Sequence, residues 1–242
     1  VYKNFSAESG LTLLEAAPLP EDVVKLGAEG VNRIWRDKKL RAVGMKRAQT
    51  LVEAAQNSIG LDGGNCARME MQLLLEDYRA KEIQLEKVTA VLEAETLKVP
   101  HAEKLLSIKG VGLITVAGFL SEVGDIRRFD SPKQIQKLAG LELKENSSGK
   151  HRGRSSISKR GRKRLRKILF QVMLPMIRNN AEFREVYEYF TTRQNNPLKG
   201  KQAIIAAGCK LIRVFYAILK HGVVYDPQKL RLDMIRPELT AA

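Results

Sequence analysis

The sequence has few of the residues that build disulfide and metal sites. Its 242 residues include two cysteines, Cys66 and Cys209, and three histidines, His101, His151 and His221. No Cys-x-x-Cys motif occurs and the histidines are scattered, so structural zinc is not expected and a reducing compartment is. No stretch approaches about 20 consecutive apolar residues, and on this criterion no membrane-spanning helix and no membrane partner are expected.

Strand patterns and carboxylate frames are also lacking. No sustained apolar–polar alternation appears, and glycine and proline separate segments of helical periodicity. Acidic residues lie mostly on helical faces, so no metal site is expected in this chain. These absences predict an all-α helical bundle. The chain begins at Val1, within a polar segment, so we expect a fragment.

What the sequence does contain is positive charge. The formal net charge is +15, while 44% of the residues are apolar. A globular chain with such an excess of cations is expected to bind a polyanion, most simply nucleic acid.

Helical periodicity predicts three regions: 1–62, a long coiled-coil-like helix within 63–99, and 100–242. The expected helices span 20–37, 45–58, 65–98, 102–107, 112–123, 132–139, 159–179, 182–192 and 198–221.

The long helix carries a heptad face, defined by Met71, Leu74, Tyr78, Leu85, Val88 and Leu92 with Lys81 as one polar position. About three heptads favour two alternatives equally: an amphipathic helix packed on its own chain, or an arm that self-associates.

The glycine hairpin, residues 108–112 (IKGVG), joins a short helix to a strongly apolar one. Bare N–H groups at a helix start attract anions, so Lys109, Gly110 and Gly112 are candidate phosphate contacts in a helix-hairpin-helix element. The alternative is an ordinary helix–helix turn. A similar but weaker pattern, in which Val43-Gly44 opens another helix, occurs at 42–55.

The basic run, residues 150–167, contains no acid and is the strongest candidate for a DNA-binding surface. We expect Arg160, Arg164 and Lys167 to share one helix face; the alternative is a solvated basic face. Aromatic residues are absent from the run, so base stacking is not indicated there. Its candidate DNA-binding residues are Lys150, Arg152, Arg154, Lys159, Arg160, Arg162, Lys163, Arg164 and Lys167.

One ordered set of short motifs is specific: Ala139-Gly140-Leu141, Ser148-Gly149, Ile157-Ser158-Lys159 with Gly161, and Leu165-Arg166. With the glycine hairpin before it and KGKQAIIAAGCKLIRVFYAILKHG after it, this set resembles the C-terminal part of insertion-sequence-110 family transposases, also called bridge-RNA-guided recombinases. The resemblance covers about 100–227, and more loosely the coiled-coil segment before it.

The resemblance implies that Ser148 is the nucleophile of a DNA transposase, helped by Mg²⁺ bound by a separate carboxylate domain in the full-length enzyme. It also implies double-stranded DNA, a guide RNA, and a homodimer or higher oligomer as partners, in the bacterial cytoplasm near the nucleoid. The alternatives are a non-catalytic helix-hairpin-helix module that binds the DNA backbone, and an RNA-binding protein.

Overall fold

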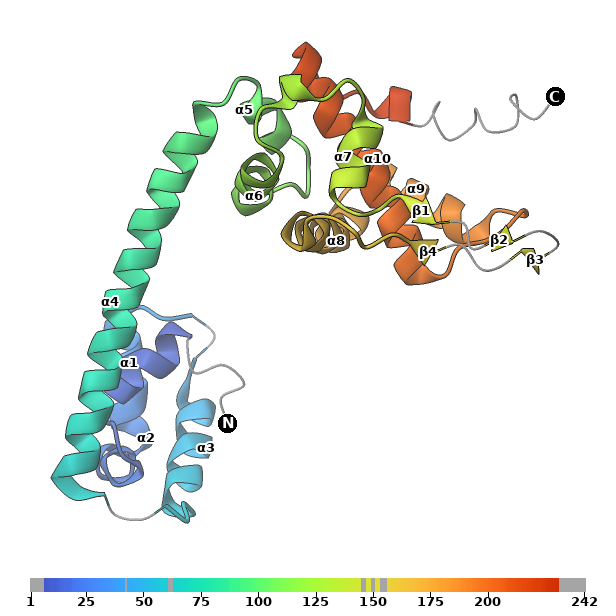
Figure 1. Cartoon of the computed structure of the whole chain (residues 1–242). Coiled ribbons are helices and arrows are strands. Elements are labelled where there is room, and N and C mark those ends of the chain that lie inside the picture. The colour runs from blue at the N-terminus through green and yellow to red at the C-terminus, as the bar shows by residue number, and fades with distance from the viewer. Residues whose placement is uncertain are drawn as a thin grey trace. The chain divides into compact units, whose positions relative to one another are not determined.

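The computed structural model describes residues 7–41, 43–60, 63–144, 147–148, 151–152 and 156–230. The chain divides into two compact units, 1–88 and 89–242 (Figure 1). Helices form most of both, which confirms the predicted all-α fold class.

The first unit contains α1 (Glu8–Ala16), α2 (Pro20–Asp37) and α3 (Met45–Gln56). Its small core surrounds the buried Trp35, whose Nε1 donates to the Ser9 carbonyl at 3.0 Å. Helix α1 was not predicted from the sequence. The helix predicted over 20–37 is interrupted at Gly27, which leaves the helical conformation with φ of 64°, a value that favours glycine.

The long helix α4 (Gly64–Leu97) packs on the first unit through charged side chains around the buried Leu75. Arg79 pairs with Glu8 at 3.1 Å and with Glu15 at 2.9 Å, and Arg68 pairs with Glu21 at 2.6 Å. The hydrogen bond from Arg79 lowers the pKa of the Glu8 carboxyl. These contacts leave the heptad face largely uncovered, since Leu74, Leu85 and Val88 are exposed.

The second unit is a helical bundle made of α5 (Ala102–Leu106), α6 (Leu113–Val123), the 3₁₀ turn η1 (Ile126–Arg128), α7 (Pro132–Leu138), α8 (Lys163–Asn179), α9 (Ala181–Thr192) and α10 (Gly200–His221). Its apolar core includes an edge-to-face pair between Phe119 and Phe215, with ring centroids 5.0 Å apart. The helix α8 continues through Pro175.

By length and composition alone, α10 could cross a membrane. Half of its most apolar 18-residue window (50%) is buried inside the unit, however. Leu211, Ile212 and Phe215 all lie in the core. Packing against the other helices therefore accounts for the apolar character of α10.

Four two-residue strands, which the sequence reading did not predict, form a β excursion between α7 and α8. Strand β1 (Leu143–Lys144) pairs antiparallel with β4 (Ser156–Ile157), and β2 (Ser147–Ser148) pairs antiparallel with β3 (His151–Arg152). Two residues separate β1 from β2 and three separate β3 from β4, so the two ladders are one residue out of register. Strands this short carry no recognisable alternation of period two.

Candidate nucleic-acid interface

Two glycines close the base of the β excursion, and we call Gly140 and Gly161 the neck. Gly140 has φ of 67°, and a Cβ there would lie 2.9 Å from the Arg160 carbonyl oxygen. A Cβ on Gly161 would lie 2.7 Å from the Gly140 nitrogen and would also overlap the Leu138 carbonyl. Two backbone segments can therefore cross here only because both positions lack a side chain.

Hydrogen bonds hold the neck to the helical bundle. Lys159 N donates to the Gly140 carbonyl at 2.9 Å, and Arg162 N donates to the Leu138 carbonyl at 2.8 Å. From α8, Arg166 Nη1 donates to the Ala139 carbonyl at 2.8 Å. The motifs at 139–141, 157–161 and 165–166 thus meet at one place and form the base of the excursion.

The candidate nucleophile Ser148 lies in β2, away from the neck along the excursion. The backbone register pairs it with His151 of β3. Only the backbone of Ser148, His151 and Arg152 is described, and Lys150 and Arg154 lie outside the described residues. The nucleophilic role of Ser148 therefore stays a prediction.

The structure corrects the predicted cationic helix face. The helix expected over 159–179 begins four residues later, because Lys159 has φ of 54° and Gly161 sits in the neck. Arg160 consequently precedes α8 and cannot share a helix face with Arg164 and Lys167. On α8 the face is instead formed by the exposed Lys163 and Lys167, spaced i, i+4.

Two cations of the basic run are paired with an acid from another helix. Arg162 Nη1 donates to the Glu122 carbonyl at 2.8 Å and lies 3.6 Å from its carboxylate, while Arg164 Nε lies 3.9 Å from the same carboxylate. The Glu122 side chain is only 15% exposed. The absence of acids within 150–167 therefore overstates the unpaired charge of this surface.

The glycine hairpin folds as a tight turn between α5 and α6. Gly110 has φ of 94°, and a Cβ there would lie 3.1 Å from the Met176 Cα. Asn180 Nδ2 donates to the Lys109 carbonyl at 3.2 Å and anchors the turn to α8 and α9. The side chain of Lys109 is exposed.

The second glycine of the hairpin has a different character. Gly112 is the N-cap of α6 with an extended φ of −107°, whereas Gly110 has a positive φ. A Cβ at Gly112 would have nothing within 4 Å. Neither backbone conformation nor neighbouring atoms require glycine here, and the position is open to close approach from outside the chain.

The glycine hairpin and the cationic start of α8 lie at opposite ends of the α6–α8 pair. Gly110 faces Met176, Gly118 faces Ile168, and Glu122 faces the start of α8, so the two helices are antiparallel. The ten residues from Gly112 to Glu122 span about 15 Å. That length is comparable with the ~12 Å width of the DNA major groove, so one duplex could reach both ends.

Metal and thiol chemistry find no support in the described part of the chain. Within it, no group of three or more His, Cys, Asp or Glu side chains is placed to hold a metal ion. The described residues therefore offer no ligand set for Mg²⁺, which the family resemblance places in a separate carboxylate domain. Burial raises the pKa of the Cys209 thiol to about 11, so it is protonated at neutral pH.

Comparison with known proteins finds a family match within the second unit. Residues 102–188 match the sequence model described as "Transposase IS116/IS110/IS902 family". This range contains the glycine hairpin, the neck, the β excursion and α8. The match therefore falls on the segment that carries the candidate site.

Three relatives illustrate the range of similar proteins. The insertion element IS900 uncharacterized 42 kDa protein of Mycobacterium paratuberculosis is 27% identical over 223 residues, which are 91% of this chain and 55% of the relative. The pilin gene-inverting protein of Moraxella bovis is 32% identical over 128 residues, 52% and 39% of the two chains. The transposase for insertion sequence element IS1328 of Yersinia enterocolitica is 27% identical over 144 residues, 59% and 43%. The chain thus spans about half the length of these relatives.

Proposed function

Residues 102–188 match the IS116/IS110/IS902 family of transposases, and on that premise we propose that the chain belongs to this family, binds duplex DNA and uses Ser148 to cleave and rejoin a strand. The observation that carries this proposal is the neck. It fixes both ends of the β excursion to the helical bundle beside the cationic start of α8. A serine on such an excursion can approach the DNA backbone while the bundle holds the duplex.

The proposed reaction is a phosphoryl transfer that conserves the phosphodiester. The Ser148 hydroxyl attacks a backbone phosphorus, a serine–phosphate bond forms, and the P–O bond to the leaving strand breaks. The proton lost by serine ends on the hydroxyl of the leaving strand. Attack by the hydroxyl of another strand end reverses these steps and joins that end. Cations close to the phosphate stabilise the charge that develops on its oxygens.

Divalent metal and guide RNA belong to the same proposal. A serine hydroxyl is almost fully protonated at neutral pH and needs activation. We therefore expect this chain alone to bind DNA without forming an adduct. We expect cleavage in a polypeptide that also carries the carboxylate domain implied by the family resemblance, supplied with Mg²⁺ and RNA.

The experiment is capture of the covalent intermediate on a nicked duplex in that longer polypeptide. Mass spectrometry should locate the adduct on Ser148, Ser148→Ala should abolish it with DNA affinity unchanged, and Ser147→Ala should retain it. An adduct on Ser147, Ser155, Ser156 or Ser158 would show that the register is wrong. An adduct formed by the 242-residue chain alone would show that the site is self-sufficient.

A second candidate function is backbone binding without catalysis, favoured by the glycine hairpin. Helix geometry leaves the N–H groups of Leu113 and Ile114 without a partner within α6, whereas Thr115 N donates to the Gly112 carbonyl at 2.9 Å. Gly112 leaves them open to a phosphate, and the helix dipole favours an anion there. If neither the longer polypeptide nor this chain alone forms an adduct, and duplex DNA still binds tightly, the result would support this function. Stronger binding of structured RNA than of duplex DNA would instead support an RNA-binding protein.

We further propose that α4 mediates self-association. Leu74 is 58% exposed, Leu85 66% and Val88 65%, and the three lie at heptad positions on one face. Exposed apolar side chains at this spacing are typical of a coiled-coil seam. The charged contacts of Arg68 and Arg79 occupy a different face of the same helix.

A further inference from the structure

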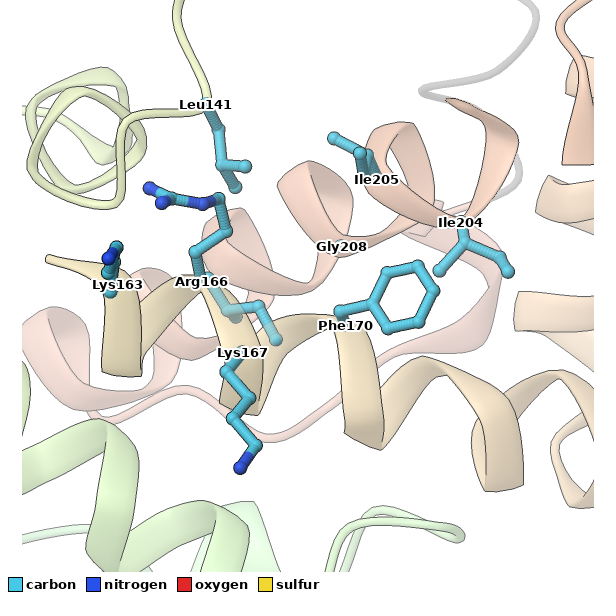
Figure 2. A pocket seen from close by; sticks show the side chains of 9 residues that line it. Leu141, Lys163, Arg166, Lys167, Phe170, Ile204, Ile205 and Gly208 are labelled. Carbon is cyan, nitrogen blue, oxygen red and sulfur yellow. The ribbon is translucent and has the colours of Figure 1, made fainter. Parts of the chain in front are cut away.

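A pocket of about 290 Å³ lies between the N-terminal halves of α8 and α10 (Figure 2). Its apolar wall is formed by Phe170 of α8 with Ile204 and Ile205 of α10, and Gly208 contributes no side chain. Leu141, two residues before β1, completes the wall on the side of the excursion. Figure 2 shows the ring of Phe170 beside Ile204, with nothing polar between their labelled side chains.

The other wall of the pocket is lined by the stems of cationic side chains, and Figure 2 shows the Lys167 ammonium directed outward, away from Ile204 and Ile205. Lys163, Arg166 and Lys167 line it together with Phe170, and these positions are spaced i, i+3, i+4 and i+7 on α8. One helix face therefore runs from positive charge to an aromatic ring within two turns. One guanidinium nitrogen of Arg166 is held by the Ala139 carbonyl, which ties this wall to the neck.

We propose that this pocket binds the base of an unpaired DNA nucleotide, with its flanking phosphates on Lys163 and Lys167. The inference rests on the proposed function, because a strand that is cut and rejoined must expose unpaired nucleotides near the serine. A nucleotide combines a flat apolar base with an anionic backbone, and the two walls match these two parts. The volume lies at the lower end of small-ligand pockets and suits one base.

Charge complementarity favours a nucleotide over an apolar peptide. A peptide side chain would fill the apolar wall but would leave Lys163 and Lys167 without counter-charge. A second copy of this chain, with net charge +15, would add repulsion. A DNA strand satisfies both walls, since aromatic stacking and phosphate contact are the two interactions that proteins use on single strands.

The direct test introduces a fluorescent ring at the pocket. Trp35, the only tryptophan, is buried in the first unit, so Phe170→Trp adds a distinct signal. We expect a single-stranded DNA oligonucleotide, or a duplex with one bulged base, to quench this signal. A fully paired duplex should bind with much less quenching, because its bases stay stacked.

Conservative variants separate stacking from packing. Phe170→Leu keeps an apolar side chain and removes the ring, and it should weaken binding of the single strand and the bulged duplex about tenfold. Affinity for the paired duplex should stay within about twofold. Phe170→Tyr should retain binding, and Leu174→Ala, at an exposed apolar position on α8, is the matched control. Circular dichroism and melting temperatures establish that each variant folds.

Three outcomes would overturn the inference. Equal losses on paired and unpaired DNA would show that Phe170 supports the fold or the whole surface. If Phe170→Leu binds every ligand as tightly as the parent does, the unpaired base binds at another site, and the proposed binding of duplex DNA is unaffected. Tighter binding of RNA of the same sequence, with equal quenching, would assign the pocket to RNA. If the parent chain binds no nucleic acid, the proposed function itself fails.

Discussion

Removing two charges from the first turn of α8 tests which surface holds the DNA backbone. Lys163 and Lys167 are exposed and, within the described residues, form no ion pair. If each neutralises one phosphate, Lys163→Ala with Lys167→Ala should reduce the slope of log K against log salt by about 1.8, at about 0.9 per phosphate. Over a fourfold rise in salt the parent should then lose about 12-fold more affinity than the variant.

Fluorescence anisotropy with a labelled duplex at several salt concentrations measures both slopes. Lys133→Ala with Lys137→Ala removes the same charge at the same i, i+4 spacing from exposed positions on α7 and should leave the slope nearly unchanged. Arg162→Ala should reduce the salt slope by less than the value of about 0.9 expected for one phosphate contact, because Glu122 already neutralises part of the Arg162 charge. Equal slope changes in the two lysine pairs would refute a localised interface and indicate diffuse attraction to the whole basic chain.

Other substitutions test the hairpin, the long helix and the first unit. Gly112→Ala should keep the melting temperature and weaken duplex binding several-fold, whereas Gly110→Ala should lower the melting temperature because its φ and the nearby Met176 require glycine. Leu85→Asp with Leu92→Asp should abolish self-association in sedimentation analysis while the off-face variant Leu73→Asp retains it; a monomeric parent would contradict the proposal. Arg79→Ala should cost the first unit about 1 kcal/mol of unfolding free energy at neutral pH. Because Arg79 lowers the pKa of Glu8, that contribution is fully present above the ordinary carboxyl pKa and is lost as pH falls through the lowered pKa of Glu8, so parent and variant should converge in urea titrations at acid pH.

Helical periodicity was sufficient to place most of the helices. The predicted 20–37 agrees with α2, and 132–139 and 182–192 lie within one residue of α7 and α9 at each end. Pro20 and Pro132 mark the starts of α2 and α7, and Gly140 follows the end of α7. The division into 1–62, 63–99 and 100–242 stays a prediction, since the compact units meet within α4 at Val88 and Thr89.

The candidate site was predicted less completely because its geometry depends on distant residues. The start of α8 is set by the crossing of Gly140 and Gly161, which are 21 positions apart in sequence, and no local pattern indicates that crossing. The pairing of Arg162 with Glu122 likewise joins two helices. Phe170 was not predicted, because it lies three residues beyond the end of the basic run. Extending the i, i+4, i+7 pattern of Lys163 by one turn would have found it.

The neck also determines how the chain can tolerate changes in length. Residues 142–158 leave and return through one fixed crossing, so they form a loop whose closure is provided by the helical bundle and not by the loop itself. Doubling the length of such a loop costs only about 0.6 kcal/mol of closure entropy. Residues inserted between β1 and β2, matched by residues inserted between β3 and β4, should therefore leave the melting temperature of the bundle almost unchanged while extending the distance that the serine-bearing strand can reach. Folding of the bundle and the reach of the serine can thus vary independently of each other.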